Sequence, residues 1–305
     1  MIVTVTPNPA LDITYTLAAL RPHESHRVET VHEQAGGKGV NVARVLHALG
    51  RRTTAVLPLG GTAGSAVKAD LDRSGIVHLT IPLTGAATRR TIAVVHDGDA
   101  TMLNEPGPEL SALQWTALRA GVASLVPAAR ALVLSGSLPR GVPPGGYAEL
   151  VRLARDRGVP VILDAAGPAL TEALDARPTI IKPNAAELRD ATGTADPPTA
   201  ARALVRAGAG TVVASLGPDG LLAVDPAGAW RAFLPADAGI SGNPTGAGDS
   251  VVAALAVGLA EHAPLPVALT RAVALSAATV QARYAGMFDR DGYRRLLPQV
   301  QVVPA

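Results

Sequence analysis

The stretch ALVLSGSLPRGVPPGGYAELVRLARDRGVPVILDAAGPALTEALDARPTIIKPN, residues 131–184, decides the fold class of this chain. Three runs rich in valine, isoleucine and leucine, at 131–136, 159–167 and 178–184, predict buried strands that end in polar or turn residues. The segments between them have helical spacing. This alternation predicts an α/β fold, a three-layer α/β/α domain with a mostly parallel central sheet. Ligands of such sheets usually bind beyond the carboxyl ends of the strands.

Two segments interrupt this rhythm. Residues 12–34 and 87–107 alternate in the manner of strands, and HDGD at 96–99 predicts a hairpin turn. We therefore predict a single domain over residues 1–305 with a small β-strand lid formed by two inserted segments, about 12–34 and 87–107. The alternative is a pair of hairpins that decorate the edges of the main sheet.

Composition excludes several classes of protein. Of the 305 residues, 48% are hydrophobic, so the chain can bury a large core. The absence of cysteine excludes disulfides and thiolate catalysis and favours a cytoplasmic location. The apolar segments are short and interrupted, and the first residues lack the pattern of a signal peptide. Basic residues are scattered and aromatic residues are rare, so neither a membrane nor a nucleic acid is expected as a partner.

The loop SGNPTGAGDS at 241–250 carries the first chemical signal. Its small residues Gly246, Ala247 and Gly248 let an anion approach the free N–H groups at the start of the apolar helix that follows. Asp249, at the same place, could accept a proton from an attacking hydroxyl, as phosphoryl transfer requires. The alternative is that Asp249 only caps the helix. Neither a Walker loop nor a G-x-G-x-x-G motif after the first strand is present, so any nucleotide must bind by another scheme.

Seven motifs in chain order resemble the ribokinase-like (PfkB) carbohydrate kinases. They are TPNPALD at 6–12, AGGKGVNVARVL at 35–46, TR at 88–89, SGSLPRGV at 135–142, KPNAAEL at 182–188, SLGPDGLL at 215–222 and NPTGAGDS at 243–250. Within that family the chain is similar to the hexose-phosphate branch, the 1-phosphofructokinases and tagatose-6-phosphate kinases. The resemblance implies a ribokinase-like domain with a lid, ATP as the phosphate donor and Mg²⁺ as the metal.

The resemblance also implies a role for each matching residue. Asp249 would be the catalytic base, and Gly246, Ala247 and Gly248 would form the anion hole. Residues expected at the sugar are Asp12, Gly36, Gly37 and Asn41. Cations and a hydroxyl expected at the phosphate already on the substrate are Arg27, Lys38, Arg89 and Ser137.

A second group would bind the nucleotide. Its members are Lys182, Asn184, Ser215, Gly217 and Gly220. Asn184 and Glu187 match an N-x-x-E motif that would position water around Mg²⁺, which prefers oxygen ligands. The alternative for this pair is a capping asparagine and a solvated glutamate.

The function predicted from these motifs is the ATP-dependent phosphorylation of a ketohexose phosphate to the bisphosphate. Asn243-Pro244 looks more like tagatose-6-phosphate kinases, whereas AGGKGVNVARVL fits both activities, so the ketohexose stays open. Alternatives are a free-sugar or nucleoside kinase of the same family and a non-catalytic regulator that binds sugar phosphates. The HESH sequence at 23–26 has poor spacing for two metal ligands on a strand. Related lids often pair between subunits, which leaves a homodimer through the lid open.

Overall fold

A computed structural model describes residues 1–96 and 99–305, and within them the main sheet has ten strands. Their order in the sheet, with their bounds, is β14 (Gln301–Pro304), β13 (Gly228–Phe233), β12 (Leu221–Asp225), β11 (Thr211–Ser215), β10 (Ile180–Ile181), β9 (Val161–Asp164), β8 (Ala131–Ser135), β1 (Ile2–Val5), β4 (Thr53–Leu59) and β5 (His78–Pro82). The strands from β11 to β5 are parallel, and β12, β13 and β14 join one edge antiparallel. The predicted α/β class with a mostly parallel sheet is confirmed.

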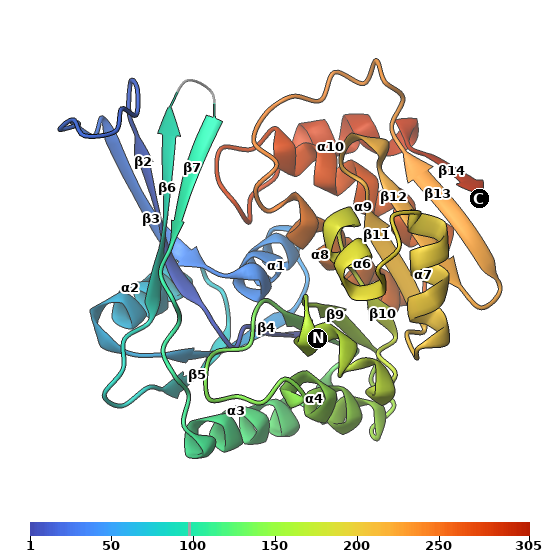
Figure 1. Ribbon diagram of the computed structural model, residues 1–305, viewed down its shortest axis with the longest axis horizontal. Helices are drawn as coiled ribbons and strands as arrows, with labels where there is room; N and C mark the ends of the chain where they lie inside the picture. The colour runs from blue at the N-terminus through green and yellow to red at the C-terminus, as the bar shows by residue number, and fades with distance from the viewer. Residues whose placement is uncertain (97–98) are drawn as a thin grey trace.

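Helices cover both faces of the main sheet (Figure 1). One face packs against α1 (Lys38–Ala48), α8 (Ala247–Glu261) and α9 (Leu265–Val280). The other face packs against α3 (Ala112–Leu125), α4 (Gly146–Arg155), α5 (Pro168–Thr171), α6 (Ala185–Thr192) and α7 (Pro197–Arg206). The two remaining described helices are α2 (Gly61–Arg73) and α10 (Arg290–Leu296). The core therefore consists of two large apolar layers separated by the sheet, with smaller clusters at α2 and at α10.

The stretch 131–184 forms three neighbouring parallel strands, β8, β9 and β10, as its pattern predicts. All their residues are buried because helices cover both faces. The last strand is only two residues long, shorter than the predicted run, and Pro183 follows soon after it without an N–H for the ladder. The register places Ser135 beside Asp164 at the carboxyl end of the sheet.

A second sheet of four strands lies apart from the main one. In sheet order it contains β3 (Thr30–Gly36), β2 (Ala10–Thr16), β6 (Arg89–His96) and β7 (Asp99–Asn104). Both inserted segments contribute to it, and their strands pair with each other and not with either edge of the main sheet. Residues 97 and 98 of the predicted turn lie outside the described residues. We call these four strands the lid sheet.

The lid sheet has two chemically different faces. Leu11 and Ile13 of β2 and Ala35 of β3 lie in an apolar cluster with residues of α2. Because side chains alternate along a strand, Asp12 and its register partners Gln34 and Thr91 point to the opposite face. Asp12 of the predicted sugar site therefore lies on the face that α2 leaves uncovered.

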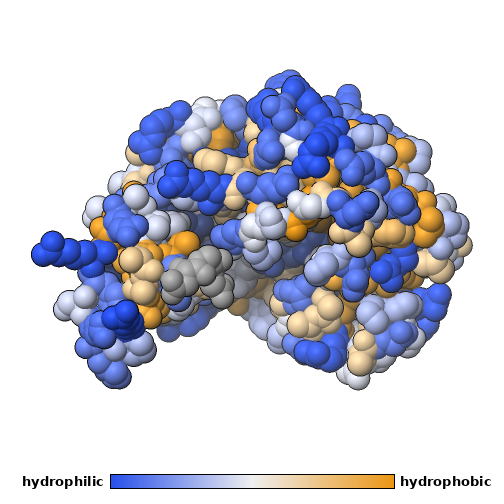
Figure 2. Space-filling model, turned by 90° about the horizontal axis from the view of Figure 1, so that it is seen from above, coloured by the Kyte–Doolittle hydropathy of each residue, from blue (hydrophilic) through white to orange (hydrophobic). Residues whose placement is uncertain are grey.

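The face drawn in Figure 2 is mostly hydrophilic, with apolar residues both on the side of the lid sheet and over the main domain. On the lid sheet the exposed apolar side chains are Val31, Met102 and Leu103, with Val28 just before β3. Among residues 1–96 and 99–305, none of the helices has the length and apolarity that a membrane crossing requires.

Candidate active site

Asp249 lies in the first turn of α8 with its side chain turned into the protein. The helix begins after Gly246, whose φ of 85° is a left-handed conformation that favours glycine, and its first turn has no side-chain cap. Asp249 is 6% exposed and accepts a hydrogen bond of 2.8 Å from Asn41 Nδ2 of α1. Asp249 therefore does not have the alternative role of capping its own helix.

The surroundings of Asp249 make its carboxyl group less acidic. Burial, and then the negative charge of Asp164, raise its pKa to about 7, against the Asn41 hydrogen bond and the charges of Lys38 and Lys182. A carboxylate with a pKa near neutrality is matched to proton abstraction from an alcohol, because it is ionised often enough and remains basic enough. Its environment thus suits Asp249 to the work of a general base.

Two lysines meet at a buried carboxylate beside Asp249. Asp164, the last residue of β9, is within 3.3 Å of Lys38 Nζ and 3.4 Å of Lys182 Nζ, both measured to Oδ1. Lys38 is the first residue of α1, and Lys182 follows β10. A Cβ built on Gly248 would lie 3.4 Å from Lys182 Nζ, so this ammonium group faces the glycine loop. Positive charge and the helix start are therefore concentrated at one place.

Asn184 and Glu187 form a capping box at the start of α6. The Glu187 N–H donates to Asn184 Oδ1, and the Asn184 N–H donates to Glu187 Oε2, both at 2.9 Å. The alternative that Asn184 is a capping residue is therefore realised in the structure. Glu187 keeps one oxygen outside the box, and this Oε1 lies 4.0 Å from Lys38 Nζ.

Among the described residues, no group of three or more histidine, aspartate or glutamate side chains could hold a metal ion, and this includes the HESH segment. Glu187 Oε1 is free of the capping box, and Asp164 Oδ2 is buried without a hydrogen-bond partner among the described residues. Such oxygen donors fit Mg²⁺, which retains several of its waters when it binds to proteins. These two oxygens therefore suit a Mg²⁺ ion that keeps most of its water ligands, and not one coordinated by protein groups alone.

Asp12 lies against the diglycine segment that joins β3 to α1. A Cβ on Gly36 would overlap the Asp12 carboxylate, and Gly37 has a φ of 101°. Burial raises the pKa of Asp12 to about 6, against the charges of Arg89 and Arg44. The missing side chain of Gly36 is therefore what makes room for this carboxylate, whereas a Cβ on Gly37 would meet Thr6 and Pro9.

Arg89 and Ser137 are both bound by Asn8. The Arg89 Nε and Nη2 atoms donate to the Asn8 carbonyl at 3.4 Å, and Asn8 Nδ2 donates to Ser137 Oγ at 3.0 Å. Because the Ser137 oxygen accepts this bond, its own hydrogen remains available to an anion. The sequence analysis did not select Asn8, although its position inside TPNPALD was a signal that could have found it.

The other two cations predicted at the substrate phosphate lie elsewhere. Arg27 is exposed in the connection between β2 and β3. Lys38 lies with Asp164 and Glu187, so the structure does not bring it together with Arg89. Asp164 was also not selected, although it is the polar end of a buried strand in the stretch 131–184.

The predicted nucleotide residues lie at the carboxyl ends of β10 and β11. Ser215 ends β11 and forms an isolated parallel bridge with Asn184. Gly217 and Gly220 bound a short 3₁₀ turn and have φ values of 62° and 81°. A Cβ on Gly220 would overlap the carbonyl of Ala232 on β13, so this turn requires glycine. These residues therefore sit beside the capping box at the same edge of the sheet.

The loop between α9 and α10 connects the lid sheet to the glycine loop. Gln34 Nε2 of β3 donates to the Ala285 carbonyl at 3.0 Å, and the His32 ring stacks on Tyr284 at 3.8 Å. A Cβ on Gly246 would lie 3.1 Å from Ala285 Cα. The lid sheet and the start of α8 are thus in contact with the same short segment.

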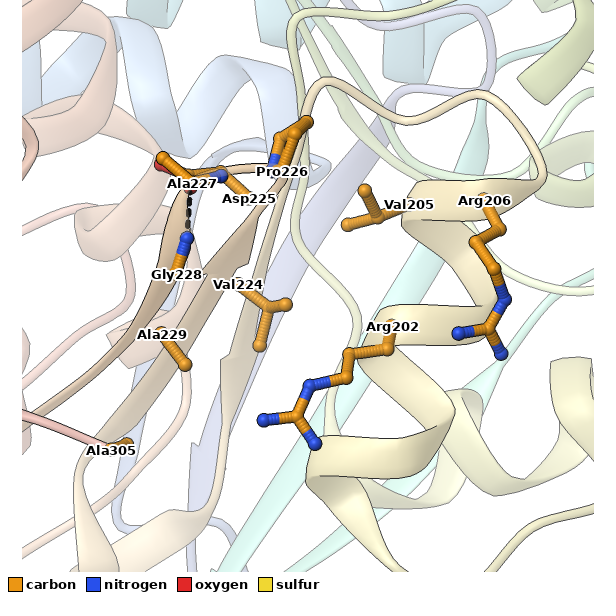
Figure 3. A pocket seen from close by; sticks show the side chains of 10 residues that line it. All are labelled: Arg202, Val205, Arg206, Val224, Asp225, Pro226, Ala227, Gly228, Ala229 and Ala305. Carbon is orange, nitrogen blue, oxygen red and sulfur yellow. Dashed lines mark hydrogen bonds between the residues drawn. The ribbon is translucent and has the colours of Figure 1, made fainter.

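A hollow lies on another part of the molecule, away from the candidate active site (Figure 3). It lies between α7 and the β12–β13 hairpin, and the residues around it are Arg202, Val205, Arg206, Val224, Asp225, Pro226, Ala227, Gly228, Ala229 and Ala305. None of the predicted site residues lines it, so it is separate from the candidate active site.

Comparisons with known proteins give a consistent result. A family model described as pfkB family carbohydrate kinase matches residues 6–289. The structure of Escherichia coli phosphofructokinase-2 in complex with fructose-6-phosphate is similar, with a TM-score of 0.87 and 30% identity over 97% of this chain and 98% of that chain. The same E. coli protein has been solved in a tetrameric inhibited form, with a TM-score of 0.88, 30% identity and the same coverage. Arabidopsis thaliana ribokinase, complexed with ribose and ATP, has a TM-score of 0.78 and 26% identity over 97% of this chain and 98% of that chain.

Proposed function

The chain belongs to the pfkB family of carbohydrate kinases, and from this premise we propose that it transfers the terminal phosphoryl group of ATP to a ketohexose phosphate. The observation that carries the proposal is the placement of Asp249. It is buried at the glycine-rich start of α8, with Lys38 and Lys182 close enough to influence its pKa. This combination supplies a base and an electropositive cradle, which are the main requirements of phosphoryl transfer.

In the proposed reaction Asp249 takes the proton of the free primary hydroxyl of the sugar. The hydroxyl oxygen forms a bond to the terminal phosphorus of ATP, and the bond from that phosphorus to the bridging oxygen breaks. ADP leaves with the electron pair, and the sugar becomes a bisphosphate. Asp12 and Asn41 orient the sugar hydroxyls, and the N–H groups at 246–248 face the charge that develops on the phosphoryl oxygens.

We assign the phosphate already on the substrate to Arg89 and Ser137. Their common link through Asn8 keeps a guanidinium group and a hydroxyl donor together, and a charged fork of this kind suits phosphate. Arg27 lies apart from them, in the exposed connection between β2 and β3, and is proposed to join them when the lid sheet closes. The ketohexose is tagatose 6-phosphate or a fructose phosphate.

The nucleotide would lie along the carboxyl ends of β10 and β11. Asn184, Ser215, Gly217 and Gly220 are proposed to flank it, and Lys182 is proposed to approach its phosphates. Mg²⁺, held through water by Glu187 beside Asn184, would neutralise charge on the ATP phosphates when bound. Closure of the lid sheet over the sugar would exclude water and limit ATP hydrolysis.

We also propose that two copies of the chain pair through the lid sheet. The support is the group of exposed apolar side chains on it, Val28, Val31, Met102 and Leu103. They lie at the two edge strands, β3 and β7, and an exposed edge offers a second copy both unpaired backbone groups and apolar surface.

An ATP-coupled assay tests the function directly. The panel is tagatose 6-phosphate, fructose 6-phosphate, fructose 1-phosphate, free fructose and ribose. Turnover of one or more of the three phosphates, with little or none of the free sugars, supports the proposal. Preference for a free sugar would indicate a free-sugar kinase, and turnover of none of them would favour a non-catalytic regulator.

Asp249→Asn tests the base. We expect the turnover number to fall by about 10²- to 10⁴-fold, with sugar-phosphate binding nearly unchanged, because the amide keeps the shape but cannot accept the proton. The matched control is Asp190→Asn, an exposed aspartate on α6, which should behave as the wild type. Near-normal turnover by the Asp249 variant would exclude it as the base.

A further inference from the structure

The hollow between α7 and the β12–β13 hairpin lies at the opposite end of the main sheet from the candidate active site (Figure 3). In the antiparallel register of β11 and β12, Ser215 at the carboxyl end of β11 is beside Leu221. Val212, near the amino end of β11, is beside Val224, which lines the hollow. Because Ser215 belongs to the proposed nucleotide site, a ligand in the hollow would not compete for the space of the two substrates.

The hollow has an apolar floor and the size of a small-molecule site. Val224 and Ala229 on the hairpin are 2% and 8% exposed, and Val205 of α7 is half-buried and turned toward them (Figure 3). The cavity volume is about 330 Å³, and the volumes of ligand sites begin at about 300 Å³. The hollow therefore suits a small metabolite that can lay a short carbon chain on an apolar surface.

Two arginines stand at the edge of this hollow. Arg202 and Arg206 are one turn apart on α7, a spacing that brings two side chains within reach of one ligand (Figure 3). Both are exposed, and within residues 1–96 and 99–305 neither side chain forms an ion pair or a hydrogen bond. Hydrogen bonds from Thr199, and then the charge of Arg202, lower the pKa of Asp196, so Arg202 acts on this acid only at a distance. The donors of both guanidinium groups remain available to a ligand.

The acid that lines the hollow is bound to its own turn. Asp225 Oδ1 accepts hydrogen bonds from the N–H groups of Ala227 and Gly228, at 2.7 and 2.9 Å. Ala305 also lines the hollow, and its N–H donates to the Ala229 carbonyl at 3.0 Å. In the described part of the chain, neither of these residues forms an ion pair with the two arginines. The protein therefore leaves both cations without an anionic partner in contact.

The guanidinium group selects the kind of anion. It is a planar fork of five donors that matches the oxygens of a phosphate, often through two hydrogen bonds at once. Two such forks one turn apart provide the donors that the doubly charged end of a phosphate monoester requires. A basic residue in the last turn also stabilises a helix through its charge. That effect accounts for Arg206, but Arg202 lies before the last turn and the hollow needs another explanation.

We propose that this hollow is a second ligand site, which binds a small phosphorylated metabolite with its phosphate on Arg202 and Arg206 and its carbon chain on the apolar floor. The proposal goes beyond the proposed kinase function. It depends neither on Asp249 nor on the identity of the sugar phosphate that reacts, because none of the candidate active-site residues lines the hollow.

Calorimetry with glycerol 3-phosphate as the probe tests the site. We expect Arg202→Gln with Arg206→Gln to weaken binding of the probe by about tenfold or more, because two charged donors are lost. The matched control is Arg152→Gln with Arg157→Gln, which removes two exposed arginines from α4 and the turn after it and should bind the probe as the wild type does. Absence of binding to the wild type at millimolar concentration, or an equal loss in the control, would overturn the proposal.

The candidate active site also offers groups that bind phosphate, and a further variant separates the two places. Arg89→Gln changes the proposed phosphate site of the substrate and leaves the hollow intact. We expect it to retain the binding that the α7 double variant loses. The reverse result, a loss in Arg89→Gln and none in the α7 double variant, would place the probe in the candidate active site and refute a second site.

Gly228→Glu tests the hollow without removing any group from it. Nothing lies near a Cβ at this position, so the side chain has room at the edge of the hollow. Its carboxylate should repel the phosphate and weaken binding of the probe by about tenfold or more, whereas Gly228→Gln, of the same size but uncharged, should retain more of the binding. Circular dichroism and thermal unfolding confirm that each variant is folded. Unchanged binding by Gly228→Glu would contradict the proposal.

Three probes distinguish a metabolite from a free phosphate ion. Glycerol 3-phosphate should bind more tightly than inorganic phosphate by about threefold or more, because its carbon chain is covered by the apolar floor, and glycerol should not bind. Inorganic phosphate that binds as tightly as the ester would overturn the assignment to a metabolite and leave the ion as the ligand. Failure of the kinase assay on every sugar, with these binding results intact, would reject the proposed function and retain the second site.

Discussion

At the scale of single residues, environment decides the chemistry more than identity does. Asp164 and Asp249 are both buried carboxylates at the same edge of the sheet, yet they have different neighbours. Two ammonium groups contact Asp164, whereas Asp249 accepts one neutral hydrogen bond and has a pKa raised to about 7 by burial and by Asp164. Because their surroundings differ, Asp164 can serve as a counter-ion and Asp249 as a base.

The pH dependence of the reaction should report Asp249. A base must be ionised to accept a proton, so kcat/KM should fall as the pH drops through about 7. Asn41→Leu removes the hydrogen bond that stabilises the carboxylate, so the pKa of Asp249 should rise and the acid limb should move up by about one pH unit. The measurement is kcat/KM against pH for both proteins.

Comparing the pH profiles of the wild type and Asn41→Leu separates titration of the enzyme from titration of its substrates. ATP and the sugar phosphate titrate identically in both assays, so a difference between the two profiles belongs to the protein. The groups that face Asp249 and carry charge, Lys38, Lys182 and Asp164, are the same in both. An acid limb that does not move, or that moves to lower pH, would contradict the assignment of the base.

At the scale of elements, the junction of β3 with α1 depends on a steric detail. β3 ends at Gly36 and α1 begins at Lys38, so a single residue in left-handed conformation turns the chain. A Cβ on Gly36 would overlap the carboxylate of Asp12 on the neighbouring strand. The diglycine thus sets the position of an acid in another strand as well as allowing the turn.

Gly36→Ala should therefore damage sugar binding. The methyl group displaces the Asp12 carboxylate, so we expect the KM for the sugar phosphate to rise by about tenfold or more, with the KM for ATP close to that of the wild type. Gly228→Ala is the control, because nothing lies near a Cβ at that position of β13. Steady-state kinetics with each substrate varied in turn makes the measurement. An unchanged KM for the sugar phosphate would mean that Asp12 does not contact the sugar.

The start of α6 shows that one element can have two roles. Asn184 and Glu187 form a complete capping box, which by itself stabilises the helix. The box uses one oxygen of Glu187 and leaves the other 4.0 Å from Lys38 Nζ. Local stability and the proposed outer contact to Mg²⁺ therefore do not compete for the same atom.

At the scale of the whole molecule, the proposed active-site residues come from two sheets. The main sheet and its helices hold Asp164, Lys182 and Asp249, whereas the lid sheet holds Asp12 and Arg89. The loop between α9 and α10 touches both parts, through Gln34 on the lid sheet and at Gly246 before α8. A displacement of the lid sheet would therefore move the segment that also contacts Gly246 of the proposed anion hole.

If two copies pair through the lid sheet, the mass of the protein in solution should depend on the apolar residues of that sheet. Val31 and Leu103 are 58% and 54% exposed, and a charge at either would be costly in an apolar interface. We expect the wild type to sediment as a dimer or larger assembly and Val31→Asp with Leu103→Asp to sediment as a monomer.

The control for that experiment is Leu113→Asp on α3, outside the lid sheet. Leu113 is 79% exposed, more than either lid residue, so a general effect of surface charge would appear there as well. Analytical ultracentrifugation at several concentrations gives the masses. A monomeric wild type, or variants that assemble as it does, would remove the lid sheet as an interface.

The sequence alone determined the fold class and the chemistry available, because both depend on local patterns. Buried parallel strands show as apolar runs between helical segments, as in 131–184, and a glycine-rich helix start shows as GAGD at 246–249. Only the tertiary structure decided which charges meet. Arg89 and Lys38 both follow recognisable motifs, but the turn after Gly37 directs Lys38 to Asp164, and Asn8 holds Arg89 near Ser137. These partners are 81 residues apart for Asn8 and Arg89, 126 for Lys38 and Asp164 and 129 for Asn8 and Ser137, and no spacing rule records a distance that is fixed by the packing of separate strands.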